Sequence, residues 1–145
     1  MTKDVLISFK GSQQDEDNKE NFEFLTEGKF YKKGGHYYIT YQESELTGMK
    51  GTTTTLKVDT DSAIVTMMRF GENNTHLIFE QGKTHTCCYE TGYGGLTIGV
   101  CSEYVDIDIS ENGGQLSCKY TIDINNNMLS VNNFNITVTE RNVHK

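Results

Sequence analysis

The 145-residue sequence contains no proline and only one alanine, Ala63. Average usage would place roughly seven prolines in a chain of this length. Proline removes a donor from the hydrogen-bond ladder of a sheet, so its absence suits a chain that spends most of its residues in paired strands. Alanine is the strongest helix former, and its scarcity argues against a helical protein.

The sequence also lacks long apolar runs. No stretch approaches the length of a membrane span, and no apolar signal core follows Met1. We therefore expect a cytoplasmic protein without a membrane partner. A reducing compartment argues against disulfides, so we predict that the four cysteines are small buried hydrophobic residues within strands. They are Cys87, Cys88, Cys101 and Cys118.

Positive charge is scarce as well. The net charge is −7, and the densest acidic stretch, residues 15–17, is followed by Glu20. Nucleic-acid binding draws most of its affinity from lysine and arginine, and no basic stripe exists here, which excludes nucleic acid as a partner. We expect the acidic loop to serve solubility, and an acidic docking surface is the alternative.

What the sequence has in abundance is β-branched residues: Thr, Ile and Val together number 36. Apolar residues alternate with polar ones at period two, and Gly, Asn and Asp mark the turns. No connection is long enough for the crossover of a parallel sheet. We predict one all-β domain over residues 1–145, a single antiparallel up-and-down barrel of about 8–10 strands, with a two-sheet sandwich as the alternative. The predicted strands are 3–13, 21–32, 36–43, 52–59, 62–70, 75–80, 84–91, 96–109, 115–124 and 129–140. Gly28 is predicted to form a bulge that lets its strand bend.

Six short motifs occur along nearly the whole chain. They are Tyr38-x-x-Tyr41-x-Glu43, the threonine-rich stretch 52–58, Met68-Arg69-x-Gly71, Leu77-x-Phe79-x-x-Gly82, Tyr89-x-Thr91-x-Tyr93-Gly94 and Gly114-x-Leu116-x-x-x-Tyr120. In order and spacing they resemble the YwiB-like family of small bacterial proteins. The resemblance implies a calycin-type barrel, similar in shape to the lipocalins, and it implies no activity.

Several of these motif residues are candidates for a ligand pocket. If they face inward, they form a polar lumen with an aromatic rim, and small barrels can hold one ligand in this way. A buried arginine needs a carboxylate partner or a ligand acid. Arg69 with Glu43 is therefore either a structural ion pair, the preferred interpretation, or the polar end of a pocket. The predicted ligand-binding residues are Tyr41, Glu43, Arg69, Tyr89, Thr91 and Tyr120.

The sequence contains no motif that clearly indicates a catalytic site or a metal site. His85 and Cys87 share one strand face, but an isolated pair at this spacing is common by chance, and we predict no metal site. No nucleophile elbow exists, and no cysteine lies at a helix amino terminus. We therefore predict no catalytic residue and no cofactor.

Three functional hypotheses follow. The first is a non-catalytic module that binds one small amphipathic or acidic ligand in the barrel lumen. The second is an interaction or assembly protein with a filled barrel, whose working surface is an exposed strand edge or the loop 45–51 and which can also form homo-oligomers. An enzyme ranks last.

Overall fold

The chain forms ten β-strands. The computed structural model describes residues 2–44, 50–71, 74–91, 94–125 and 127–141, and these residues contain no helix. The strands are β1 (Lys3–Gln14), β2 (Lys19–Lys33), β3 (His36–Gln42), β4 (Thr53–Asp59), β5 (Ile64–Phe70), β6 (Thr75–Glu80), β7 (Thr84–Thr91), β8 (Gly94–Ser110), β9 (Gly113–Ile124) and β10 (Asn127–Glu140).

Each strand pairs antiparallel with its neighbours in the sequence, and β1 closes the barrel by pairing with both β2 and β10. The predicted all-β, up-and-down barrel is therefore confirmed, and the sandwich alternative is wrong. Every strand boundary lies within two residues of its predicted position. Closure satisfies the two edges that a ten-stranded open meander would expose.

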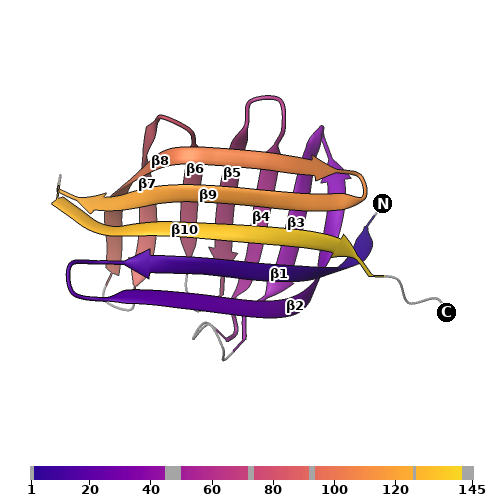
Figure 1. Ribbon diagram of the computed structural model, residues 1–145, viewed down its shortest axis with the longest axis horizontal. Coiled ribbons are helices and arrows are strands. Elements are labelled where there is room, and N and C mark those ends of the chain that lie inside the picture. Colours follow the sequence, from indigo (N-terminus) through magenta and orange to yellow (C-terminus); the bar gives the residue numbers. More distant parts are fainter. Residues whose placement is uncertain (1, 45–49, 72–73, 92–93, 126, 142–145) are drawn as a thin grey trace.

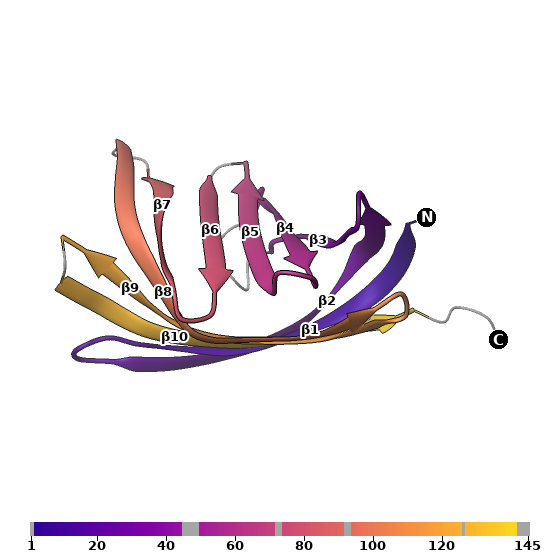
Figure 2. The ribbon, with the colours of Figure 1, turned by 90° about the horizontal axis from the view of Figure 1, so that it is seen from above.

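The barrel is flattened into two layers that cross each other (Figure 1). Strands β1, β2, β9 and β10 and much of β8 form one long, curved layer, and β3 to β7 stand against its concave side (Figure 2). Two long strands join the layers. β2 pairs with β1 along residues 19–30 but with β3 only along residues 28–33, and β8 passes from β7 to β9 in the same manner.

Gly28 does not form the predicted bulge. β2 keeps its register through this residue, which lies opposite Val5 of β1 and Tyr41 of β3. The shifts in register fall between Ser102 and Tyr104 and between Met128 and Ser130. Glycine is required at position 28 for space, because a Cβ atom there would lie 2.5 Å from the Cδ1 atom of Ile7 and 2.5 Å from the Thr40 carbonyl oxygen. The residue permits a close approach of strands where β2 acquires its second partner.

Inward-facing residues form one continuous core. Alternate positions of β3, β4 and β6 are buried, as the period-two pattern predicts. The largest fully buried side chains are Phe79, Ile7, Ile39, Leu56, Leu116 and Ile136.

The cysteines follow the same alternation. All four are unpaired, as predicted; Cys87 and Cys118 are buried, and Cys101 is half-buried. The prediction that all four are buried is wrong for Cys88, which is exposed. Neighbouring residues of a strand point to opposite faces, so Cys87 and Cys88 cannot both lie inside.

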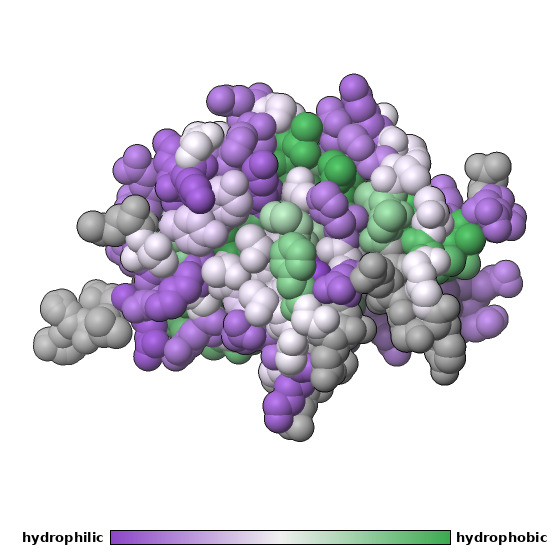
Figure 3. Space-filling view, turned by 180° about the vertical axis from the view of Figure 1, so that it is seen from behind, coloured by the Kyte–Doolittle hydropathy of each residue, from purple (hydrophilic) through white to green (hydrophobic). Residues whose placement is uncertain are grey.

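The outside of the β3–β7 layer carries residues of intermediate hydropathy over its middle and hydrophilic ones mainly toward its margins, with hydrophobic ones at separate places between them (Figure 3). No helix with the length and apolarity to cross a bilayer occurs in the described ranges.

Replacing Gly28 with alanine tests the close approach. We expect Gly28→Ala to lower the free energy of unfolding by about 2 kcal/mol, because the added methyl group meets a backbone carbonyl that cannot move away. Urea denaturation followed by circular dichroism measures the change. Gly95→Ala is the matched control, because a Cβ atom there meets nothing within 4 Å. Equal effects at the two positions would contradict the packing explanation.

Candidate functional site

A cavity of about 800 Å³ occupies one end of the barrel. Its volume lies in the range of small-molecule sites, roughly 300–1,000 Å³. The wall comes from both layers, at the ends of the strands nearest the β1–β2 and β9–β10 turns. The lining residues are Phe9, Ser12, Gln13, Glu20, Asn21, Phe22, Glu23, Phe24, Tyr41, Glu43, Met67, Arg69, Leu77, Tyr120, Ile122, Asn132, Asn133 and Phe134.

Strand register assembles the polar part of this wall. Tyr41 of β3 lies opposite Thr54 of β4, and Thr54 lies opposite Arg69 of β5. Directly opposite residues have side chains on the same face and close together. Three residues distant in the sequence therefore form one row across the sheet. The row continues to Gly28 on one side and to Thr75 on the other.

Glu43 extends this row into a cluster. Its amide donates to the Thr52 carbonyl at 2.8 Å, which continues the β3–β4 ladder beyond the last residue of β3. The side chain is only 1% exposed, and its carboxylate accepts a hydrogen bond from the Thr54 hydroxyl and hydrogen-bonds with the Tyr41 phenol. A carboxylate held by hydrogen-bond donors tolerates burial that an unpartnered one would not.

Arg69 supplies the positive charge beside this carboxylate. Its Nε atom lies 3.8 Å from Glu43 Oε2 and donates to Thr54 Oγ1 at 3.4 Å. The separation from Glu43 exceeds that of a charge-assisted hydrogen bond, which is about 2.8 Å. Both described interactions of Arg69 use Nε. Within the described part of the chain the two Nη nitrogens have no acceptor, and a carboxylate or phosphate matches their geometry.

Two buried tyrosines, Tyr41 and Tyr120, lie close enough to Arg69 for its charge to affect their pKa values. Burial raises the pKa of the Tyr41 phenol above its ordinary value of 10.0, and the adjacent Glu43 charge raises it further. Burial also raises the pKa of Tyr120, whereas the nearby Arg69 charge opposes the rise in both residues. Both phenols stay protonated at neutral pH, so they can donate hydrogen bonds into the cavity.

The opposite wall is aromatic. Phe9 stacks on Phe24 with ring centroids 5.0 Å apart, and also on Phe22 and Phe134, at 5.8 and 5.9 Å. Tyr120 packs on Phe79 at 4.6 Å. Such a wall provides an apolar surface for the body of a ligand, and it adjoins the polar cluster where Phe24 lies 6.1 Å from Tyr41, measured between ring centroids.

The structure brings four of the six predicted site residues to the cavity: Tyr41, Glu43, Arg69 and Tyr120. The side chains of the other two, Tyr89 and Thr91, lie outside the described residues. The predicted Arg69–Glu43 ion pair is present.

Sequence reasoning missed Thr54, the phenylalanine wall and Asn132, a buried residue whose amide donates to Ser130 Oγ at 3.0 Å. The alternation Phe22-x-Phe24 near the start of β2 carried a usable signal for the wall. It matches the inward-facing spacing seen in the other strands. Thr54 and Asn132 had no comparable signal, because each is defined by its neighbours across strands.

The buried thiols differ from reactive ones. Burial raises the pKa of the Cys118 thiol to about 12 and also raises that of Cys87. A thiol in this state is a poor nucleophile, since the thiolate is the reactive form.

His85 pairs through Nε2 with Glu80 Oε1 at 3.0 Å. Among the described residues, no three His, Cys, Asp or Glu side chains gather closely enough to hold a metal ion.

Comparisons with known proteins agree with this architecture. Residues 7–136 match the model of a family described as a domain of unknown function, DUF1934. The chain is 26% identical over 134 residues to the "Uncharacterized beta-barrel protein YwiB" of Bacillus subtilis (strain 168), across 92% of this chain and 91% of that protein. The crystal structure of the ywiB protein from Bacillus subtilis superposes with a TM-score of 0.84 at 24% identity, covering 97% of this chain and 93% of that one.

Removing Arg69 tests the ion pair. We expect Arg69→Met to lower the free energy of unfolding by about 3 kcal/mol, because it removes the positive charge 3.8 Å from the buried Glu43 carboxylate. The double variant Glu43→Gln/Arg69→Met should recover most of the loss, since the amide oxygen of glutamine can still accept from Thr54. Urea denaturation of both variants measures their free energies of unfolding and shows whether the double variant recovers the loss. A double variant as unstable as the single one would contradict an electrostatic origin.

The buried phenols predict a specific loss of stability in alkali. Above about pH 10 the unfolded chain releases the protons of Tyr41 and Tyr120 while the barrel retains them, so stability falls as the pH rises. We expect a contribution of about 1 kcal/mol from each phenol over the first pH unit above 10. When urea denaturation is repeated across this pH range, the free energy of unfolding should fall less steeply with pH for Tyr41→Phe/Tyr120→Phe than for the wild type. Tyr38→Phe, on the outer face, is the control and should keep the wild-type slope.

Proposed function

The chain belongs to the DUF1934 family of β-barrel proteins, and from this premise we propose that its barrel binds one small amphipathic molecule through an acidic group. Arg69 meets a carboxylate or phosphate of the ligand, and the phenylalanine wall receives its apolar body. The observation that carries this proposal is an arginine whose two Nη nitrogens have no acceptor among the described residues and which lines a cavity of about 800 Å³.

The energetics support an acid at this place. Glu43 has hydrogen bonds from Thr54 and Tyr41, so it does not need the Nη nitrogens of Arg69 for its own burial. A bidentate contact between guanidinium and carboxylate contributes directional hydrogen bonds in a region of low dielectric. Tyr120 lines the same cavity and can donate to the ligand as well.

The compartment forms part of the proposal. Four unpaired cysteines fit a reducing environment, and we propose that the protein binds its ligand in the cytoplasm. The second hypothesis, an assembly protein, required a filled barrel. The cavity favours the ligand hypothesis over that alternative.

Native mass spectrometry of gently purified protein provides the first test. We expect an added mass that disappears on denaturation and recurs after a change of expression host. The variant Glu43→Gln/Arg69→Met should lose it. Arg141→Met is the matched control, because Arg141 pairs with Glu27 outside the cavity, and this variant should keep the added mass.

A fluorescent probe tests a protein purified without ligand. Anilinonaphthalene sulfonate combines an anionic group with an aromatic body, so we expect it to bind at one site with increased emission. The affinity should fall about tenfold in Glu43→Gln/Arg69→Met, as for the loss of a charged hydrogen bond. Equal affinity for the wild type, the double variant and Arg141→Met would refute the proposed role of Arg69.

A further inference from the structure

The amino-terminal half of β2 has an open edge. β2 pairs with β1 from Lys19 onward but with β3 only from Gly28 onward. Along residues 19–27 the side of β2 that faces away from β1 has no strand partner in the described part of the chain. In Figure 1 this strand is the lower border of the front layer. Alternate residues of such an edge present free N–H and C=O groups.

This open edge also borders the cavity. Five consecutive β2 residues, 20–24, line the cavity wall. A strand that presents only one face to a cavity contributes alternate residues, so a consecutive run shows that the edge itself is reached. Phe22 is 42% exposed there, although its ring stacks on Phe9. An added strand would lie across the cavity mouth.

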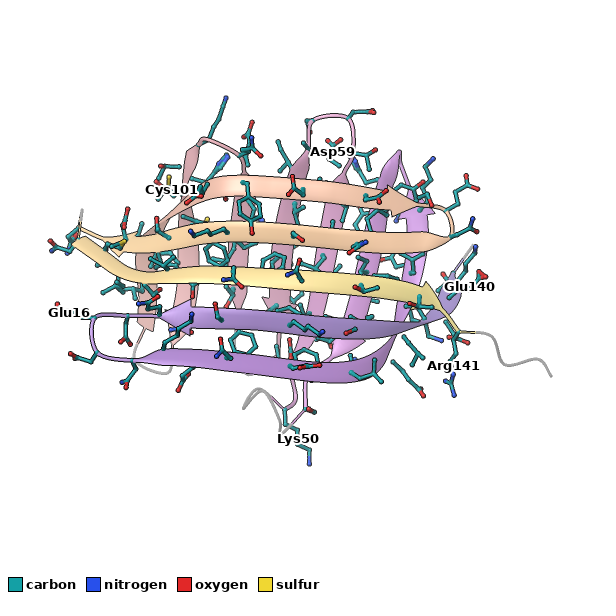
Figure 4. All side chains as sticks on the ribbon, viewed as in Figure 1. Glu16, Lys50, Asp59, Cys101, Glu140 and Arg141 are labelled. Atoms are coloured by element: carbon teal, nitrogen blue, oxygen red, sulfur yellow. The ribbon has the colours of Figure 1, made fainter. Side chains whose placement is uncertain are left out.

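The edge and the adjoining turn are strongly acidic. Residues 15–27 contain six carboxylates and a single cation, Lys19. Glu16 lies at the tip of the β1–β2 hairpin, at the opposite end of the molecule from Glu140 and Arg141 (Figure 4). Glu27 pairs with Arg141 at 3.0 Å, whereas the described ion pairs do not involve Glu20 or Glu23.

We propose that the open edge of β2 binds an extended basic peptide segment by β-strand addition. The peptide pairs its backbone with residues 20–27. Its side chains then alternate: apolar ones opposite Phe22 and Phe24 face the cavity mouth, and basic ones opposite Glu23 face outward. Main-chain hydrogen bonds supply affinity in this mode, and alternate side chains supply specificity.

A second copy of the chain fits the edge less well. Antiparallel pairing of β2 with itself about Glu23 places that carboxylate directly opposite Glu23 of the other copy. Like charges directly opposite one another in a sheet are destabilising. The charge of the edge therefore favours a basic partner.

The test uses a fluorescein-labelled peptide, Lys-Val-Lys-Phe-Lys-Val-Lys, and fluorescence anisotropy with the full chain. We expect saturable binding to one site. Two versions of the peptide carry N-methyl groups on the lysines or on the apolar residues. Strand addition predicts that one version loses about tenfold or more in affinity while the other retains it, because only alternate amides donate to the edge. Equal affinity of the two versions would overturn the proposal.

Variants with fewer carboxylates distinguish binding at this edge from a nonspecific attraction of the basic peptide to an acidic protein. Glu20→Gln/Glu23→Gln should weaken the peptide about fivefold, an effect that salt reduces. The matched control Asp106→Asn/Asp108→Asn removes two exposed carboxylates from β8, at the far side of the layer. It should leave affinity unchanged, and an equal loss would overturn the proposal.

Two further results decide the remaining questions. The peptide should bind Glu43→Gln/Arg69→Met as it binds the wild type, so failure of the small-ligand proposal leaves this one standing. Analytical ultracentrifugation identifies the competing occupant. The proposal would be overturned by a concentration-dependent dimer with two properties. The substitutions Glu20→Gln/Glu23→Gln would strengthen this dimer, and the peptide would not dissociate it. Such a result would assign the edge to a second copy of the chain.

Discussion

The antiparallel register from β2 to β6 is the constraint on which the candidate site depends. It places Gly28, Tyr41, Thr54, Arg69 and Thr75 in one row across five strands. A slip of one residue in any of these pairings would move the side chains of a strand to the other face. The buried apolar positions that alternate in the same strands hold the register, because a slip would expose them. Core and site are thus specified by the same pairing.

The change of partners along β2 connects the cavity with the open edge. From Gly28 onward β2 is paired on both sides, and before Gly28 it is paired only with β1. The strand needs glycine at this position, because a Cβ atom there would lie 2.5 Å from Ile7 Cδ1 of β1 and 2.5 Å from the Thr40 carbonyl oxygen of β3. The barrel closes on one side of this residue. On the other side β3 no longer covers the strand, and the cavity reaches the edge.

Charge is distributed unevenly over this region. Arg69 lies inside, where its side chain is 17% exposed and water screens it weakly. The carboxylates of the β1–β2 hairpin lie in solvent, where salt reduces their influence beyond about 10 Å. The interior therefore selects an acidic group over short distances through directed hydrogen bonds. The rim attracts basic groups over longer distances, and its effect depends on ionic strength.

Local patterns in the sequence predicted the strands and their up-and-down order, because alternation and turn residues act between near neighbours, and they favoured a closed barrel while leaving a sandwich open. They also identified Tyr41, Glu43, Arg69 and Tyr120 as residues that share a cavity if they face inward. Only the tertiary structure decided that Thr54 joins Glu43 and Arg69, that the phenylalanines form the opposite wall, and that Gly28 serves close approach without a bulge. It alone showed where β2 lacks a partner. Cross-strand register depends on the pairing of residues distant in the sequence, and no local pattern contains that information.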